Sequence, residues 1–365
     1  MAVRVIQAGM GGWGVNWAEN VVPKVSNVKT VAYVDMAAAS LERAQAKLGL
    51  SSKCYFKSLS EALSAVECDA VLITSQLEGH IPLSLEALAA GRHVLVEKPF
   101  AASIEDAQKA VIEAERQDRV LMVSQNYRFQ PAPIAVRKII ERSDLGAVGT
   151  VHIDFRRYAN HAPIEGHKHY GIWHPLLVDM SIHHFDLMRM VLGVEPLRIE
   201  CRTWNPSWSR FKSASSGSAI IDFENNITVD YRGSWVSTDT QTSWSGDWRI
   251  ECEKGVVEWC SRGDAGVPER VTVRRLGKEP KEIKLPKVAR RDREGCLAAF
   301  AKAVEKGLAV DTSGRDNINT LALMFGAVKA ADTGVPVFLR APELAEIASG
   351  NGGQAGMAVS AGSNR

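Results

Sequence analysis

The chain has 365 residues, of which 45% are hydrophobic and 24% are charged, and its formal net charge is +2. This length favours two domains over one, and the composition is that of an ordinary globular protein. A charge so close to zero, without a run of basic residues, argues against general nucleic-acid binding. Because the chain lacks an N-terminal leader pattern and any run of 18 apolar residues, we expect a cytoplasmic protein without a membrane span.

The first predicted strand, residues 3–8, leads into glycines with the spacing of a dinucleotide-binding loop. In the pattern Gly-x-Gly-x-x-Gly, the first glycine allows a tight turn and the second lets the backbone approach a pyrophosphate. The third lets the next helix, expected over 13–21, pack against the strand. The N-terminus of that helix would present free N–H groups to the phosphates. We therefore predict cofactor contacts from Gly9, Gly11, Gly12, Trp13 and Gly14.

A second apolar run, residues 28–34, ends at Asp35. An acidic side chain about 20 residues past the last glycine can accept hydrogen bonds from the adenosine ribose. Such a carboxylate favours NAD because it repels the 2′-phosphate of NADP, and Met36 and Ala37 offer no arginine to hold that phosphate. The sequence therefore predicts NAD as the cofactor, with NADP less favoured. The competing interpretation is a Gly-rich turn in another kind of α/β protein.

Residues 2–125 continue to alternate short apolar runs with helical patterns. We predict further strands at 70–74, 93–96 and 120–124, and helices at 38–47, 59–65, 79–90 and 104–117. This alternation is typical of βαβ units that form a parallel sheet with helices on both faces. Ligands of such sheets bind at the carboxyl ends of the strands. Cofactor contacts are therefore also expected from residues that follow these runs, namely Thr74, Ser75, Glu97 and Gln125.

The pattern changes near residue 125 to a helix that ends near residue 142 and then to longer, alternating strands. The expected strands span 149–158, 195–204, 217–224, 227–236, 245–253, 255–260, 269–275 and 281–285. They indicate a large, mostly antiparallel sheet. A helical segment at about 175–192 interrupts the strands, and helices at about 292–305 and 317–332 follow. Whether these late helices return to the first domain stays open, and we expect the Gly/Ala/Ser/Asn-rich tail, 349–365, to be disordered.

Several stretches together resemble the Gfo/Idh/MocA oxidoreductase family, the relatives of glucose–fructose oxidoreductase and inositol dehydrogenase. The first is the glycine loop with Asp35, and the second is Glu97-Lys98-Pro99 together with the preceding His80, Ala87, Ala90-Gly91 and His93. The third is Asn126-Tyr127-Arg128-Phe129, and the fourth is Asp179-Met-Ser-Ile-His183-His-Phe-Asp186. The resemblance reaches to about residue 340. It implies a Rossmann domain, 1–125, and an α+β domain, 126–340, whose open antiparallel sheet often serves oligomerisation, so a homodimer or homotetramer is expected.

The resemblance places Lys98 beside the nicotinamide and the substrate hydroxyl, where an ammonium can stabilise an alkoxide-like oxygen. The Lys98-Pro99 peptide bond is commonly cis in the family. Asp179 and His183 stand four residues apart on a predicted helix and so share a face. We predict His183 as the general acid/base and Asp179 as a residue that binds or orients substrate. Proton removal by Lys98 with His183 as relay remains an alternative, as do a surface lysine and a polar helix face without catalytic role.

Other residues of these stretches have two interpretations each. Family positions imply cofactor contacts from His80, Lys98 and Arg157, and substrate contacts from Lys98, Tyr127, Arg128 and Arg156. Exposed strand-end charge is the competing interpretation of Arg156 and Arg157. His184 points about 100° from His183 on a helix and is expected to be structural, and Asp186 is either on the catalytic face or a buried carboxylate.

Seven of the nine histidines lie between residues 152 and 184. The spacing of His167, His169 and His174 fits no standard zinc pattern, and we expect no metal. The segment 161–174 is expected to shape the mouth of the cleft, with substrate contacts from His161, His167, His169, Asp179 and His183. The six cysteines lack Cys-x-x-Cys spacing and are interpreted as buried reduced thiols.

The sequence thus predicts an NAD-dependent dehydrogenase that acts on a secondary hydroxyl of a sugar, cyclitol or glycoside. One alternative is an enzyme that recycles tightly bound NAD through a keto-sugar intermediate during epimerisation or glycoside cleavage. Another is a dinucleotide-binding sensor without turnover, which would have no need of Lys98, Asp179 and His183 together. Five tryptophans of the second half are expected mostly at a subunit interface, namely Trp204, Trp208, Trp235, Trp244 and Trp248.

Overall fold

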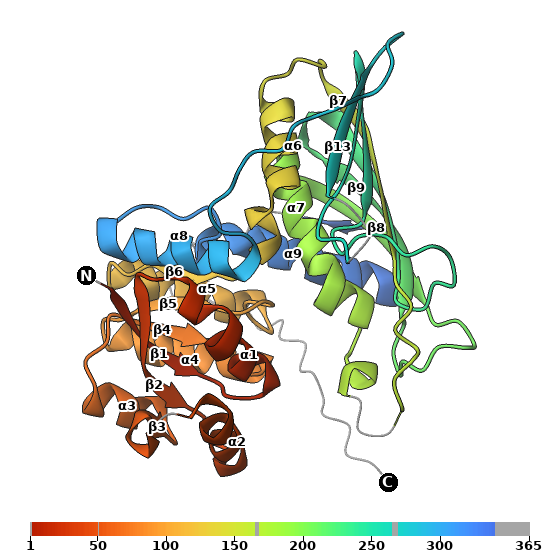
Figure 1. The fold of residues 1–365 in the computed structure, drawn as a ribbon. Helices are drawn as coiled ribbons and strands as arrows, with labels where there is room; N and C mark the ends of the chain where they lie inside the picture. The colour runs from red at the N-terminus through yellow and green to blue at the C-terminus, as the bar shows by residue number, and fades with distance from the viewer. Residues whose placement is uncertain (1, 50, 165–167, 265–268, 340–365) are drawn as a thin grey trace, which may run out of the picture.

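The computed structural model describes residues 2–49, 51–164, 168–264 and 269–339, and it contains two sheets that share a helical region between them (Figure 1). The predicted disordered tail, 349–365, and the predicted substrate contact at His167 lie outside the described residues. Among the described residues no helix is long and apolar enough to cross a membrane, and no cluster of three or more His, Cys, Asp or Glu side chains could hold a metal ion.

The N-terminal sheet has six strands, all parallel, in the order β3-β2-β1-β4-β5-β6. Its strands are β1 Val3–Ala8, β2 Val28–Val34, β3 Tyr55–Phe56, β4 Ala70–Ile73, β5 His93–Val96 and β6 Leu121–Val123. Its helices are α1 Gly12–Asn20, α2 Ala38–Leu48, α3 Leu59–Ala65, α4 Leu77–Ala89 and α5 Ile104–Arg116, with short 3₁₀ turns at Val22–Lys24 and Ser52–Cys54. This order is that of a Rossmann fold, as the sequence predicts. Only the two-residue strand β3, too short for a pattern, escaped prediction.

Local signals explain where several of these helices begin. The hydroxyl oxygen of Ser58 accepts a hydrogen bond from the backbone N–H of Glu61 at the start of α3, and Ser103 does the same for Asp106 at the start of α5. Such caps satisfy N–H groups that have no partner within the helix. Strand β4 is buried at all four residues, which explains its continuous apolar run.

The second sheet has nine strands in the order β14-β13-β12-β11-β7-β10-β9-β8-β15, and only the β7–β10 pair is parallel. The strands are β7 Val148–Arg156, β8 Pro196–Trp204, β9 Ser216–Phe223, β10 Ile227–Ser234, β11 Asp247–Cys252, β12 Gly255–Cys260, β13 Arg270–Arg275, β14 Lys281–Glu282 and β15 Val337–Phe338. The helices are η3 Asn126–Phe129, α6 Pro131–Glu141, η4 Lys168–Gly171, the π-helix η5 Pro175–Ser181, α7 Ile182–Leu192, η6 Glu224–Asn226, α8 Asp292–Lys306 and α9 Gly314–Thr333. The predicted mostly antiparallel sheet is confirmed, and only β15 was not expected.

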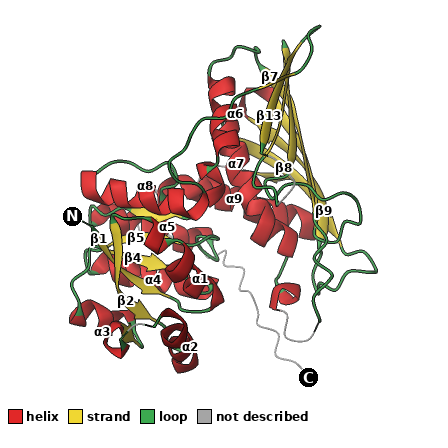
Figure 2. Cartoon of the chain, viewed as in Figure 1, coloured by secondary structure: helices red, strands yellow, loops and turns green. Residues whose placement is uncertain are grey.

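Helices cover one face of the nine-stranded sheet and leave the other open. Helices α6, α7 and α9 lie on one side of it, and no described helix covers the opposite side (Figure 2). Residues alternate accordingly, because Val229 and Tyr231 of β10 are buried whereas Asp230 and Arg232 between and beyond them are exposed. Arg232 pairs on the open face with Asp154 of β7.

Helix α8, the first of the two late helices, returns to the six-stranded sheet. Its Leu297 and Phe300 are buried in one apolar cluster with Val5 of β1, Leu72 of β4 and Met122 of β6. The chain therefore crosses between the two sheets more than once, and the N-terminal sheet needs residues from the far end of the chain to complete its core. A domain boundary at residue 125 stays a prediction.

Tryptophan and cysteine positions correct two expectations. Trp235 and Trp248 are buried within the core, so the interface interpretation is wrong for these two, whereas Trp244 is half-buried and lines a cavity. Trp204 and Trp208 are exposed. All six cysteines are free thiols, but only Cys68 and Cys296 are buried, and the other four are half-buried.

Candidate active site

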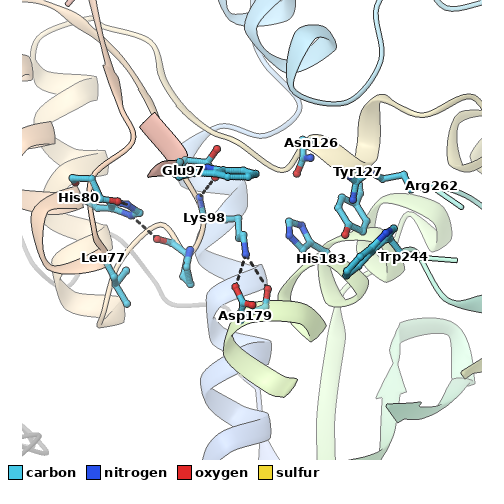
Figure 3. A pocket seen from close by; sticks show the side chains of 13 residues that line it. Leu77, His80, Glu97, Lys98, Asn126, Tyr127, Asp179, His183, Trp244 and Arg262 are labelled. Carbon is cyan, nitrogen blue, oxygen red and sulfur yellow. Dashed lines mark hydrogen bonds and ion pairs between the residues drawn. The ribbon is translucent and has the colours of Figure 1, made fainter. Parts of the chain in front are cut away.

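Two adjoining cavities, of about 510 and 440 Å³, lie where the carboxyl ends of β4 and β5 face helix α7. Figure 3 shows the side chains that line the first of them. Six residues line both, so we treat them as two lobes of one cleft: Trp13, Lys98, Tyr127, Asp179, His183 and Trp244. The first lobe continues along the N-terminal sheet, lined by Ser75, Leu77, His80, Glu97, Pro99, Asn126 and Arg262. The second lobe continues into the second domain, lined by Ala159, His161, His169, Met180 and Trp235.

Lys98 and Asp179 meet at the junction of the two lobes. The Lys98 Nζ donates to the carbonyl oxygen and to Oδ1 of Asp179, both at 2.9 Å (Figure 3). An ammonium has three N–H donors, so one remains for an oxygen in the cleft. The Lys98-Pro99 peptide bond is cis.

The carboxylate of Asp179 is engaged on both oxygens, because its Oδ2 lies 3.3 Å from Nε2 of His169. Burial opposes the negative charge of Asp179, but Lys98 and His169 outweigh it and hold the pKa of this carboxyl below its ordinary value. Asp179 is therefore an ionised bridge between a lysine and a histidine. This arrangement fits orientation of Lys98 better than direct contact with substrate.

His183 lies against the ring of Tyr127, with ring centroids 4.0 Å apart and an interplanar angle of 4°. Its Nδ1 is buried and has no hydrogen-bond partner among the described residues, which leaves Nε2 as the nitrogen available to the cleft. Burial, followed by the charges of Lys98 and Arg262, lowers the pKa of His183 well below its ordinary value. The ring is therefore neutral near pH 7 and able to accept a proton.

The segment from Pro175 to Leu192 is helical, as predicted, but its first half is a π-helix. Asp179 and His183 nevertheless line the same cleft. Asp186 does not, because it is buried in an ion pair with Arg128. His184 also points away, and its Nε2 donates to the carbonyl of Trp244 at 3.0 Å, as expected for a structural residue.

The glycine loop has the shape that a dinucleotide requires. Gly9 has a φ of 98°, and a Cβ on it would lie 2.3 Å from the backbone nitrogen of Ser75. A Cβ on Gly14 would lie 1.8 Å from the carbonyl oxygen of Gly9, whereas Gly11 and Gly12 face open space. Helix α1 has no side-chain cap and no acidic residue in its first turn, so its N–H groups are available to a phosphate. These residues fit NAD, and they lie beside Trp13, outside the two lobes.

Asp35 lies at the end of β2 beside this loop. Its Oδ2 accepts a hydrogen bond from the backbone N–H of Met10 at 2.7 Å, and its Oδ1 accepts one from Ala37 at 2.9 Å. Each carboxylate oxygen has a second lone pair, so these contacts leave room for ribose hydroxyls. The side chain of Met36 is 89% exposed, so this edge is open to a ligand.

The wall next to β5 contains a contact that the sequence did not reveal. The indole Nε1 of Trp17 donates to Oε1 of buried Glu97 at 2.7 Å.

His80 and Thr74 also contact the backbone near the cleft. The Nδ1 of His80 lies 2.7 Å from the carbonyl oxygen of Pro99. Burial lowers the pKa of His80 despite its two carbonyl contacts. Thr74 donates from Oγ1 to the carbonyl of Gly9 at 2.7 Å, so it supports the loop from below.

Three arginines that the sequence predicted as contacts line neither lobe of the cleft. Arg128 is buried outside the cleft, where it pairs with Asp186 and Asp316. Arg156 pairs with acidic residues of the open sheet face, namely Asp154, Asp239 and Asp247. Arg157 lies behind Trp244, with its guanidinium carbon 4.1 Å from that ring, and pairs with Asp264. In each case a carboxylate far along the chain takes the arginine away from the cleft.

Of the remaining predicted contacts, His161 and His169 line the second lobe. His174 does not shape the mouth, because its Nε2 pairs with Asp332 at 3.1 Å. Gln125 lines neither lobe, and its buried amide has no partner among the described residues. Residues that the sequence did not single out for the cleft include Arg262, and the close contact of its guanidinium with Tyr127 had no local signal.

Comparisons with known proteins agree with this fold. Residues 3–125 match a family described as "Oxidoreductase family, NAD-binding Rossmann fold", and residues 134–258 match the "GFO/IDH/MocA C-terminal domain". An inositol 2-dehydrogenase of Rhizobium meliloti is 26% identical over 84% of this chain and 90% of its own length. A scyllo-inositol 2-dehydrogenase (NAD(+)) of Bacillus subtilis is 26% identical over 64% of this chain and 68% of its own.

A solved structure with a similar fold is an oxidoreductase from Agrobacterium radiobacter in complex with NAD+, L-tartaric acid and magnesium. It superposes with a TM-score of 0.79 over 93% of this chain and 99% of its own, at 22% sequence identity. At that identity the likeness supports the fold alone, and it agrees with the two matched domains.

Proposed function

The chain belongs to the GFO/IDH/MocA family of NAD-binding oxidoreductases, and we propose that it oxidises or forms a secondary hydroxyl group of a sugar, cyclitol or glycoside. The convergence of Lys98, Asp179 and His183 at the junction of the two lobes carries this proposal. Inositol dehydrogenases among the relatives support a polyol as substrate.

NAD, when bound, supplies the hydride acceptor. The free N–H groups at the start of α1 would hold its phosphates, and Asp35 would hold its adenosine ribose. The first lobe, between Trp13 and His80, would receive the nicotinamide. The second lobe would receive the substrate, because it is lined by aromatic faces and imidazoles that suit ring faces and hydroxyl groups.

Each residue at the junction has a distinct role in the proposed reaction. His183 accepts the hydroxyl proton on Nε2, because its buried ring is neutral. Lys98 donates its remaining N–H to the reacting oxygen and so stabilises negative charge there. Asp179 holds the Lys98 ammonium in position and stays ionised.

The experiment is an assay of NADH formation with a panel of inositols, aldoses, aldonic acids and glycosides, with NAD and NADP in parallel. The proposal predicts NADH formation with at least one polyol and a preference for NAD. Binding of NAD is measured separately by calorimetry. NAD binding without NADH formation from any member of the panel would favour an enzyme that recycles bound NAD or a sensor, and would contradict net oxidation.

A further inference from the structure

We propose that Arg262 is a positioning residue for His183 and acts through the ring of Tyr127. The inference rests on the proposed function, in which His183 accepts the substrate proton. Arg262 follows β12, Tyr127 belongs to η3 and His183 belongs to α7, so three separate segments build one column of stacked groups beside the cleft.

The column is closely packed at both contacts. The guanidinium carbon of Arg262 lies 4.0 Å from the centroid of the Tyr127 ring. The Tyr127 and His183 rings stack almost in parallel at a centroid distance of 4.0 Å. Tyr127 and His183 are both buried, so neighbouring side chains restrict the motion of the two rings (Figure 3). Cation–π contacts and aromatic stacking both depend on the orientation of the ring, so together they favour one orientation of a side chain.

Among the described residues, no hydrogen bond at Nδ1 orients the ring of His183. A histidine that acts as a general base is usually oriented by a hydrogen bond at the ring nitrogen that faces away from the substrate. In this protein the buried Nδ1 of His183 has no such partner among the described residues. The stack on Tyr127 is therefore the contact that fixes the plane of the imidazole and the direction of its Nε2.

Arg262 is itself held firmly. Its Nε donates to Oδ2 of Asp292 at 2.8 Å, and its Nη2 lies 2.7 Å from the same oxygen. Both residues have a left-handed backbone, with φ values of 57° for Arg262 and 54° for Asp292. Such strain persists only where surrounding contacts enforce it, and it is concentrated at functional sites. Asp292 also accepts a hydrogen bond from Asn126, the neighbour of Tyr127 in η3.

Arg262 also contributes charge. The charged and titratable groups that act on His183 are Lys98, Arg262, Asp179 and His184, and the ring of Tyr127 stacks on it. After burial, Lys98 and Arg262 disfavour a proton on the imidazole, and Asp179 opposes them. Burial also raises the pKa of Tyr127 to about 12, so this ring stays uncharged between the arginine and the imidazole. Together these effects keep the imidazole of His183 neutral at the pH of the reaction.

The experiment compares Arg262→Gln, Arg262→Lys and Tyr127→Leu. Arg262→Gln removes both charge and stack, and should lower kcat roughly tenfold with little change in the KM for substrate. The acidic limb of kcat/KM for alcohol oxidation should move to higher pH by about one unit, because a cation is lost near His183. Arg262→Lys keeps the charge, so the limb should stay in place while kcat falls. The Tyr127→Leu/Arg262→Gln double variant should lose no more kcat than Tyr127→Leu alone, at a pH above the acidic limb where the imidazole is neutral in both.

Arg198→Gln is the matched control. Arg198 also lies over an aromatic ring, 5.9 Å from Phe338, and pairs with Glu200 and Asp222, but it belongs to the far edge of the nine-stranded sheet. The Arg198→Gln variant should leave kcat and the pH profile unchanged. Effects of Tyr127→Leu and Arg262→Gln that add fully, or an acidic limb that does not move in Arg262→Gln, would overturn the inference.

An NMR titration of histidine-labelled protein separates this inference from the proposed function. The His183 signal is assigned by its loss in His183→Ala, and its pKa should rise by about one unit in Arg262→Gln and stay constant in Arg262→Lys. This measurement needs no substrate. If the unmutated protein shows no turnover but the His183 pKa shifts in Arg262→Gln, the proposed function is rejected and the role of the stack is retained. If the unmutated protein turns over substrate but the His183 pKa does not shift in Arg262→Gln, the role of Arg262 is rejected and the proposed function is retained.

Discussion

Lys98 and Asp179 are 81 residues apart in the chain, yet the Lys98 Nζ lies 2.9 Å from Oδ1 of Asp179. Lys98 follows β5 of the parallel sheet, and Asp179 belongs to the π-helix η5 that precedes α7. The pair therefore joins the carboxyl edge of one sheet to the helical layer of the other. Both residues line both lobes, so this contact lies where the two lobes of the cleft meet.

Replacement of Asp179 by Asn tests this contact. The amide can still accept one hydrogen bond, but it removes the charge that holds the Lys98 ammonium. We expect kcat to fall roughly 100-fold while the Kd for NAD changes little. Asp154→Asn, which breaks an ion pair with Arg232 on the open sheet face, is the control and should keep full activity. Full activity of Asp179→Asn would exclude the bridging role.

His183→Ala tests the general base. We expect turnover to fall by roughly 10²- to 10⁴-fold, with a much smaller change in NAD affinity measured by calorimetry. His152→Ala alters an imidazole of the open sheet face, near Asp230, and should have no such effect. If turnover and NAD affinity fell by the same factor, His183 would be a residue of the binding surface instead.

The N-terminal half of the site was accessible to sequence reasoning because its signals are local. The glycines, Asp35 and Lys98 each follow a predicted strand, and parallel strands bring their carboxyl ends to one edge. Asp179 and His183 were also predictable, because neighbouring turns of a helix share a face. The π-helical start of this segment was not, since no local pattern in Pro175–Ser181 distinguishes it from an α-helix.

The errors about which side chains reach the cleft involve partners distant in the sequence. Arg128 follows a strand of the N-terminal sheet like the true cleft residues, but Asp316, 188 positions later, takes its guanidinium. Arg262 and Trp244 reach the cleft from loops between strands of the second sheet, where no periodicity or spacing marks them. Sequence reasoning therefore found the residues placed by one element, and missed those placed by pairing between elements.

The choice of cofactor is tested at Asp35. Asp35→Asn removes the charge that repels a 2′-phosphate but keeps an acceptor for the N–H of Met10 or Ala37. We expect the ratio of kcat/KM with NAD to that with NADP to fall at least roughly tenfold. Asp35→Ala should do the same and also weaken binding of both cofactors, because the loop loses its acceptor. An unchanged ratio in both variants would mean that the ribose is recognised elsewhere.

The Arg128–Asp186 pair predicts a large effect on stability. Both side chains are buried, and the Arg128 Nε lies 2.7 Å from Oδ2 of Asp186. Arg128→Met should lower the free energy of unfolding by about 3–5 kcal/mol, because it leaves a buried carboxylate unpaired. Urea unfolding measures the loss. The surface pair of Arg116 and Glu113 is the control, and Arg116→Met should cost far less, because solvent screens such a pair.

A second variant separates the pair from packing. Arg128→Met/Asp186→Leu removes both charges, so it should recover part of the stability that Arg128→Met loses. If the double variant were as unstable as the sum of the two single variants, the ion pair would contribute nothing beyond the volume of its side chains.

His184 predicts a dependence of stability on pH. Burial lowers the pKa of His184 from 6.5 to about 4, so the unfolded chain binds a proton more readily than the folded one. The contribution of neutral His184 to the free energy of unfolding is complete above pH 6.5 and declines as the pH falls toward 4. His184→Gln lacks this titration. The difference in unfolding free energy between the natural protein and His184→Gln should therefore shrink by about 3 kcal/mol between pH 7 and pH 4, given the shift from 6.5 to about 4. A difference that stays constant over this range would mean that His184 titrates alike in both states.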